Sequence, residues 1–178
     1  MKKKNNQDRQ NNPKPQAQSK KQIEQTVRNL VEAIITNLGY EIWDIEYYND
    51  KIEWLLEITI ENPSGEPISI DDCEKVTRAV NPVIDEADPI ESSYSLAVSS
   101  PGLNRELKND FHLSKYINKE VTIKLFAKNE EIGDKNFNAV LKEFSKEEFK
   151  LEKIPKKNII VLAKKEIAHI YAHDEIDI

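Results

Sequence analysis

Residues 98–107 read V-S-S-P-G-L-N-R-E-L, and the pattern of the chain differs on the two sides of this run. Pro101 fixes its own φ and Gly102 permits a positive φ, so the run predicts a tight turn at the end of a strand. Helical and strand periodicities alternate before it, whereas short strands alone follow it. We therefore expect an N-terminal domain over 21–105 and a C-terminal domain over 106–178, preceded by a disordered basic arm at 1–20.

The N-terminal side predicts an α-β-β-α-β order. Apolar residues recur at three- and four-residue steps over 23–38, which indicates a helix that ends at Gly39. Residues 40–48 and 53–61 alternate apolar and acidic side chains, so two strands are expected, the first with Trp43, Ile45 and Tyr47 facing the core. A second helix is expected from an N-cap at Ser69 until Pro82 kinks or ends it, and a third strand over 94–98. This order predicts a three-stranded sheet with two helices on one face.

The C-terminal side predicts a small β-barrel. A short amphipathic stretch around Phe111, Leu113 and Tyr116 makes the junction. Five short strands are expected over 121–126, 137–144, 149–154, 159–162 and 167–171, and closing them into a barrel would remove the sheet edges. The fold class is therefore α+β.

Charge is spread unevenly along the chain, whose formal net charge is −6. Residues 1–20 carry 6 basic side chains against 1 acidic, residues 21–105 carry 6 against 17, and residues 106–178 carry 14 of each. An acidic block of this size repels a phosphate backbone and attracts basic protein. Direct contact with nucleic acid is therefore expected from the arm or the C-terminal half.

Several functional classes have little support. No apolar run approaches the length of a membrane helix, and no secretory leader is evident, so a cytoplasmic protein is expected. The single Cys73 is expected in the core, and His169 and His173 lie too far apart along a strand to share a metal. No phosphate-binding glycine loop and no nucleophile elbow occurs, so we expect neither an enzyme nor a cofactor or metal site.

Two charged groups remain as candidate binding surfaces. The first is the acidic face of the two N-terminal strands, either a solvated face or a surface for basic protein, with Asp44, Glu46, Glu53, Glu57 and Glu61. The second is a lysine cluster around the last strands, either ordinary solvated lysine or a phosphate-contacting rim, with Lys153, Lys156, Lys157, Lys164 and Lys165.

The string V-S-S-P-G-L-x-R, with G-Y-E-I-W-D at 39–44 and the stretch 68–80, resembles the bacterial ribosome maturation factor RimP family. The resemblance runs from about residue 21 to 171. It implies an N-terminal α/β domain, a C-terminal SH3-like (Sm-like) barrel, and a non-enzymatic, monomeric factor for assembly of the small ribosomal subunit. Such a factor binds the free subunit, helps to incorporate head-region proteins, and contacts a basic ribosomal protein near the decoding site and the adjoining rRNA.

The signature string itself has two interpretations. Its residues Ser99, Ser100, Pro101, Gly102, Leu103 and Arg105 are expected to form the domain junction, with Leu103 and Leu107 packed against the barrel. Arg105 either bridges the two domains or contacts phosphate. The competing function is a stand-alone RNA-binding regulator that uses the barrel and the arm.

Overall fold

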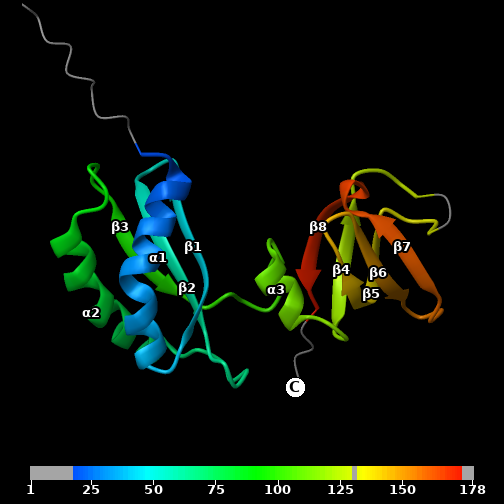
Figure 1. Cartoon of the computed structure of the whole chain (residues 1–178), viewed down its shortest axis with the longest axis horizontal. Coiled ribbons are helices and arrows are strands. Elements are labelled where there is room, and N and C mark those ends of the chain that lie inside the picture. The colour runs from blue at the N-terminus through cyan, green and yellow to red at the C-terminus, as the bar shows by residue number, and fades with distance from the viewer. Residues whose placement is uncertain (1–17, 130–131, 174–178) are drawn as a thin grey trace, which may run out of the picture. The chain divides into compact units, whose positions relative to one another are not determined.

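The computed structural model describes residues 18–129 and 132–173 (Figure 1). The chain divides between Ser99 and Ser100 into two compact units. Residues 1–17 of the expected arm lie outside the described residues. Within the described part, no helix has both the length and the apolar character needed to cross a membrane.

The N-terminal unit begins with α1 (Lys20–Asn37). The Ser19 side chain accepts a hydrogen bond from the backbone N–H of Gln22, and the Gln22 side chain accepts one from the N–H of Ser19. This capping box satisfies donors that the first turn leaves open. Gly39, at φ 94°, follows the helix in a conformation that costs glycine little.

Three strands form the sheet of this unit: β1 (Glu41–Asn49), β2 (Trp54–Glu61) and β3 (Ser95–Ser99). Their order is β1-β2-β3. The first pair is antiparallel and the second is parallel, because α2 (Ile70–Ala87) crosses over between β2 and β3. Both helices pack against each other and against the sheet, and they cover one face, as the sequence predicted (Figure 1).

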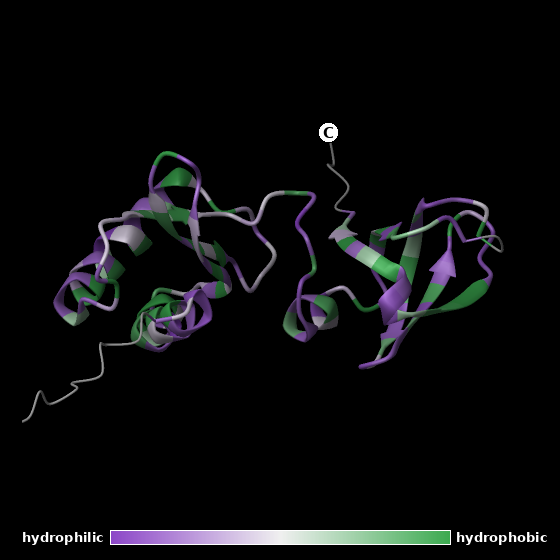
Figure 2. Ribbon diagram, turned by 90° about the horizontal axis from the view of Figure 1, so that it is seen from above, coloured by the Kyte–Doolittle hydropathy of each residue, from purple (hydrophilic) through white to green (hydrophobic). Residues whose placement is uncertain are grey.

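Pro82 does not end α2, which was one of the two outcomes predicted for it. The helix continues through it to Ala87. Pro82 lies on the exposed side of the helix, while Val80 and Ile84 face the core. An exposed proline places its ring and the missing hydrogen bond toward water, so the buried stripe continues across it. Figure 2 shows helices that carry both hydrophobic and hydrophilic segments, as expected for one-sided burial.

The core lies between the helices and the sheet. It includes Ile42, Ile45 and Tyr47 from β1. Trp43 is buried as expected, with 3% of its surface exposed, but it lies outside this cluster, and because its neighbour Ile42 is buried too the strict alternation expected for this strand is wrong. The cause is a bulge between Ile42 and Asp44, where the register with β2 shifts by one residue. A bulge inserts one residue into a strand and thereby changes which side chains face the core.

The C-terminal unit contains α3 (Asp110–Lys115) and one five-stranded antiparallel sheet. Its strands are β4 (Glu120–Leu125), β5 (Asn136–Phe144), β6 (Glu148–Lys153), β7 (Ile159–Ala163) and β8 (Ile167–Ala172). A 3-10 turn, η1 (Lys164–Glu166), joins β7 to β8. The hydrogen-bonded order is β7-β6-β5-β4-β8.

The expected closure of this sheet into a barrel is wrong, because β7 and β8 do not pair. Another segment occupies the edge of β8. The N–H of Leu107 donates to the carbonyl of Ile170 at 2.8 Å, and the N–H of Ala172 donates to the carbonyl of Arg105 at 2.8 Å. Residues 105–107 therefore cover the strand edge that β7 would need for closure.

Candidate functional site

Four of the five predicted acidic residues lie on the sheet face opposite the helices. Asp44 and Glu46 on β1 and Glu57 and Glu61 on β2 alternate with residues of the core. Alternation in a strand sends neighbouring side chains to opposite faces. Glu53 precedes β2 and lies beside its beginning. We call this surface, formed by Asp44, Glu46, Glu53, Glu57 and Glu61, the acidic face.

Carboxylates oppose each other directly across the acidic face. Glu46 on β1 is the register partner of Glu57 on β2, and Glu41 is the partner of Glu61. Like charges directly opposite each other on neighbouring strands destabilise a sheet. Glu41 was not among the predicted residues, and only the strand register reveals its place beside Glu61. The strand register thus gathers four carboxylates into two opposed pairs.

Hydroxyl groups hold two of these carboxylates in position. Tyr48 Oη donates to Glu57 Oε2 at 3.0 Å, and Ser99 Oγ donates to Glu57 Oε1 at 2.8 Å. Ser95 Oγ donates to Glu53 Oε2 at 2.5 Å. The hydrogen bond to Glu57, followed by burial and the nearby negative charges, raises the pKa of Tyr48, so its hydroxyl stays a donor at neutral pH. The strand side chains thus preorganise the acidic face.

The predicted lysine cluster is divided between the two ends of β7. Lys156 and Lys157 lie exposed in the turn before this strand, while Lys164 and Lys165 lie exposed in η1 after it. A five-residue strand spans roughly 13 Å between its terminal Cα atoms. Lys153 differs from the other four, because its Nζ donates to the carbonyl of Ile132 at 2.6 Å. The predicted lysines therefore fall into two exposed pairs and one hydrogen-bonded side chain.

The signature string falls at the boundary of the two units. Ser99 ends β3, and Ser100 and Pro101 lead to Gly102, whose φ of 70° fits the predicted turn. Leu103 is half exposed, whereas Leu107 is buried. The Arg105 guanidinium lies 6.0 Å above the Tyr116 ring. Both residues belong to the C-terminal unit, where the string anchors the edge of β8.

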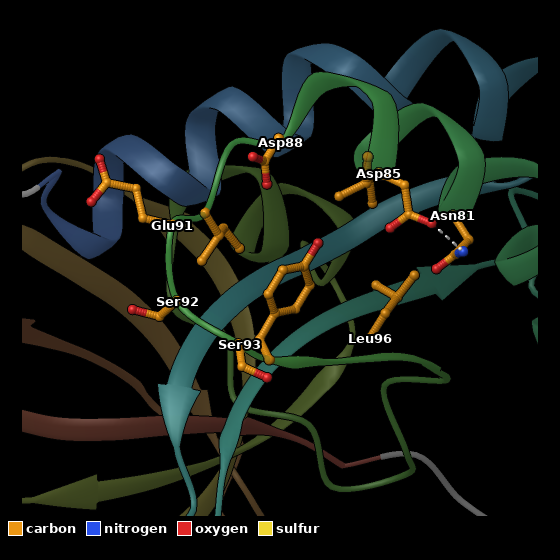
Figure 3. A pocket seen from close by; sticks show the side chains of 10 residues that line it. Asn81, Asp85, Asp88, Glu91, Ser92, Ser93 and Leu96 are labelled. Carbon is orange, nitrogen blue, oxygen red and sulfur yellow. Dashed lines mark hydrogen bonds between the residues drawn. The ribbon is translucent and has the colours of Figure 1, made fainter.

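A pocket that sequence reasoning did not predict lies at the end of α2 and the connection to β3 (Figure 3). Its volume is about 350 Å³, and its lining includes Asp85, Asp88, Glu91 and Tyr94. Asn81 Nδ2 donates to Asp85 Oδ2 at 2.9 Å. Burial, and then the charges of Asp85 and Asp88, raise the pKa of Tyr94. Neither histidine nor cysteine lines it, and none of the predicted acidic residues lies in it.

Among the described residues, no group of three or more His, Cys, Asp or Glu side chains is placed to hold a metal ion. Asp72 illustrates the structural use of a carboxylate here. It accepts hydrogen bonds from Tyr40 Oη at 2.5 Å and from Ser69 Oγ at 2.7 Å. These bonds, with that from the Ser69 N–H, lower the pKa of Asp72 to about 2. The carboxylate connects the N-terminus of α2 to the residue just before β1.

The sequence of the N-terminal unit matches a known family model. Residues 30–104 match the RimP N-terminal domain. The N-terminal unit carries the RimP N-terminal domain. The match confirms the resemblance to the RimP family that the sequence motifs indicated. This RimP N-terminal domain includes the whole acidic face and the signature string through Asn104, whereas α3 and the strands β4 to β8 lie beyond it.

Proposed function

We propose that the chain is a maturation factor for the small ribosomal subunit, which binds the free subunit through a basic ribosomal protein and nearby rRNA. One observation carries this proposal: residues 30–104 match the RimP N-terminal domain, and the RimP family consists of ribosome maturation factors. The factor acts in the cytoplasm as a non-enzymatic assembly chaperone and as a monomer. Its partner protein is the basic one near the decoding site.

The acidic face is the proposed contact for that basic protein. Glu46 is exposed and stands opposite Glu57, while Tyr48 and Ser99 fix the Glu57 carboxylate. Fixed carboxylates produce a negative field before the partner arrives, so little side-chain ordering remains to be done on binding. Complementary fields increase the rate of encounter and disfavour wrong partners more than they add affinity.

The exposed lysines at the ends of β7 are the proposed contacts for rRNA. Lys156 and Lys157 at one end and Lys164 and Lys165 at the other are far enough apart to touch separate phosphates. Lysine contacts with phosphate position a protein without reading sequence. The basic arm at 1–20 adds further cationic charge to this contact.

Sedimentation of a cell lysate tests the function directly. The chain should travel with free small subunits and be missing from mature translating ribosomes. A stand-alone RNA-binding regulator would instead remain with small RNAs at the top of the gradient. Recovery of the chain mainly on translating ribosomes, or away from ribosomal particles, would contradict the proposal.

Charge reversal tests the acidic face. Glu46→Lys should slow association with purified basic small-subunit protein several-fold and weaken its salt dependence, because an attractive field is replaced by a repulsive one. The matched control is Glu86→Lys, which makes the same charge change at an exposed position on α2. Equal association rates for the parent and both variants would show that the acidic face does not bind this protein.

A further inference from the structure

Phe126 is an exposed aromatic residue in a basic setting. It follows the last residue of β4, and 67% of its surface is open to solvent. In the sequence K-L-F-A-K, its neighbours Lys124 and Lys128 are also exposed. Leu125, between Lys124 and Phe126, is buried and anchors the strand. The ring of Phe126 therefore contributes little to the core and is presented to solvent.

The turn η1, which carries two more lysines, adjoins Phe126 through its backbone. The N–H of Phe126 donates to the carbonyl of Glu166 at 3.0 Å, which fixes the start of the β4–β5 connection against η1. Lys164 and Lys165 directly precede Glu166 and are exposed. Residues forty positions apart in the sequence thus form one local group, in which Phe126 adjoins the turn that carries Lys164 and Lys165. The Nζ of Lys164 lies 6.0 Å from the centroid of the Phe149 ring.

The group continues along β4 and β8. Lys124 is the register partner of His169, and its Nζ lies 4.7 Å from the centroid of the Tyr171 ring. The His169 and Tyr171 rings are 5.8 Å apart. From Lys124 to Phe126 the strand rises roughly 7 Å. Aromatic and cationic groups therefore alternate along this surface, which we call the Phe126 strip: Lys124, Phe126, Lys164, Lys165, His169 and Tyr171.

Three carboxylates around the strip, those of Glu106, Asp134 and Glu166, have hydrogen-bond or ion-pair partners. Glu166 Oε2 accepts from the N–H of Ala163 at 3.0 Å, and Glu106 Oε1 pairs with His169 Nδ1. Asp134 accepts from two backbone N–H groups, and these bonds, with the charge of Lys128 as a smaller cause, lower its pKa. Glu147, whose carbonyl accepts from the N–H of Lys164, also lies near η1. Lys124 and Lys165 form no ion pair within the described residues.

We infer that the Phe126 strip binds single-stranded RNA, with an unpaired base stacked on Phe126 and the flanking phosphates held by Lys164 and Lys165. This inference rests on the proposed function and specifies its rRNA contact. An aromatic ring beside cationic side chains is the usual arrangement for single strands, because every base has a face that can stack. A duplex hides those faces, so the strip selects unpaired RNA.

Binding of the full-length chain to fluorescein-labelled octa-adenylate and octa-uridylate tests the inference, with an RNA duplex as the competing probe. Phe126→Ala should weaken binding to the single strands about 10-fold and leave the salt dependence unchanged. Lys165→Gln should lower the slope of log affinity against log salt by about 0.7, the value for one phosphate contact in single strands. Phe126→Trp should retain binding, and its added fluorescence should be quenched by stacking.

The matched control is Val161→Ala, which removes a side chain of similar exposure on β7, outside the strip. Thermal melting of each variant shows whether it folds, and an exposed position makes large losses unexpected. The inference is overturned if Phe126→Ala binds single strands like the parent, or if the added tryptophan fluorescence does not respond. In that case the parent chain would still co-sediment with free small subunits. Failure of the RNA-binding inference can therefore be told apart from failure of the proposed function.

Discussion

Replacing Ile58 by alanine should test whether the two compact units are separate folding domains. Ile58 has no solvent exposure and lies on β2, the central strand of its sheet. Its register partners are Ile45 on β1 and Val98 on β3. Neighbouring strands on both sides and helices above restrict any collapse around the smaller side chain. We therefore expect a cavity to remain.

The expected loss of stability follows from this restricted collapse around Ile58. Truncating a buried isoleucine to alanine costs about 2–5 kcal/mol, and poorly collapsing sites lie in the upper half of this range. For a small domain whose stability falls by about 1.5 kcal/mol per molar urea, a loss of about 3.5 kcal/mol lowers the midpoint of unfolding by about 2 M. If the alanine variant fails to fold, Ile58→Val can replace it, because it should cost only about 0.5–1.5 kcal/mol of stability and still shift the midpoint of unfolding measurably.

Tryptophan fluorescence during urea unfolding is a selective assay, because both tryptophans of the chain, Trp43 and Trp54, belong to the N-terminal unit. The matched variant is Leu151→Ala, at a fully buried position on β6 of the C-terminal unit. We expect Ile58→Ala to shift the fluorescence transition and Leu151→Ala to leave it in place. An equal shift with Leu151→Ala would refute the reasoning and show that the chain unfolds as one cooperative unit.

Three further predictions concern local structure in the N-terminal unit. Pro82→Ala should raise the free energy of unfolding by about 1–3 kcal/mol in urea titrations, because alanine supplies the backbone donor that proline lacks within α2. Ser69→Ala should lower it by about 1 kcal/mol, since one side of the capping box is lost; Ser64→Ala, in an exposed turn, is the control. Tyr40→Phe removes the hydroxyl donor to Asp72, whose folded pKa of about 2 lies below its ordinary value of 3.8. The stabilisation from a lowered carboxyl pKa is fully present above about pH 4 and is lost as the pH falls through about 2, so melting temperatures of parent and variant should differ at pH 6 and converge in acid.

Hydrophobic periodicity was sufficient to predict the N-terminal elements, because each one is amphipathic. The stripe of Ile23, Val27, Val31 and Ile35 that indicated α1 is the stripe that the structure buries. The placement of Trp43 could not be predicted in this way, since a bulge depends on how β1 aligns with β2. Periodicity describes one segment at a time, whereas register is a property of two.

The same distinction explains the open sheet of the C-terminal unit. The five short strands lie where the sequence predicts them, whereas barrel closure rested on their number and on the family resemblance. Which segment occupies the edge of β8 depends on long-range hydrogen bonds of Arg105 and Leu107, and these carry no local signal in the sequence. The division of the lysines has a similar cause, because Lys157 and Lys164 are close in sequence but are separated by the length of β7.

The strand register says more about the acidic face than its composition does, because the register shows that carboxylates stand directly opposite each other. On β5 and β6, Lys142 pairs with Glu152 at 3.1 Å, whereas the register of β1 and β2 places Glu46 beside Glu57. The C-terminal unit thus contains cross-strand ion pairs of the ordinary kind, and the N-terminal unit has carboxylates opposite carboxylates. A cationic partner that binds over Glu46 and Glu57 would relieve this repulsion, so part of the folding cost becomes binding energy. This coupling would give a physical reason for the proposed division of labour, with protein binding on the domain that has the RimP match and phosphate contacts on the other.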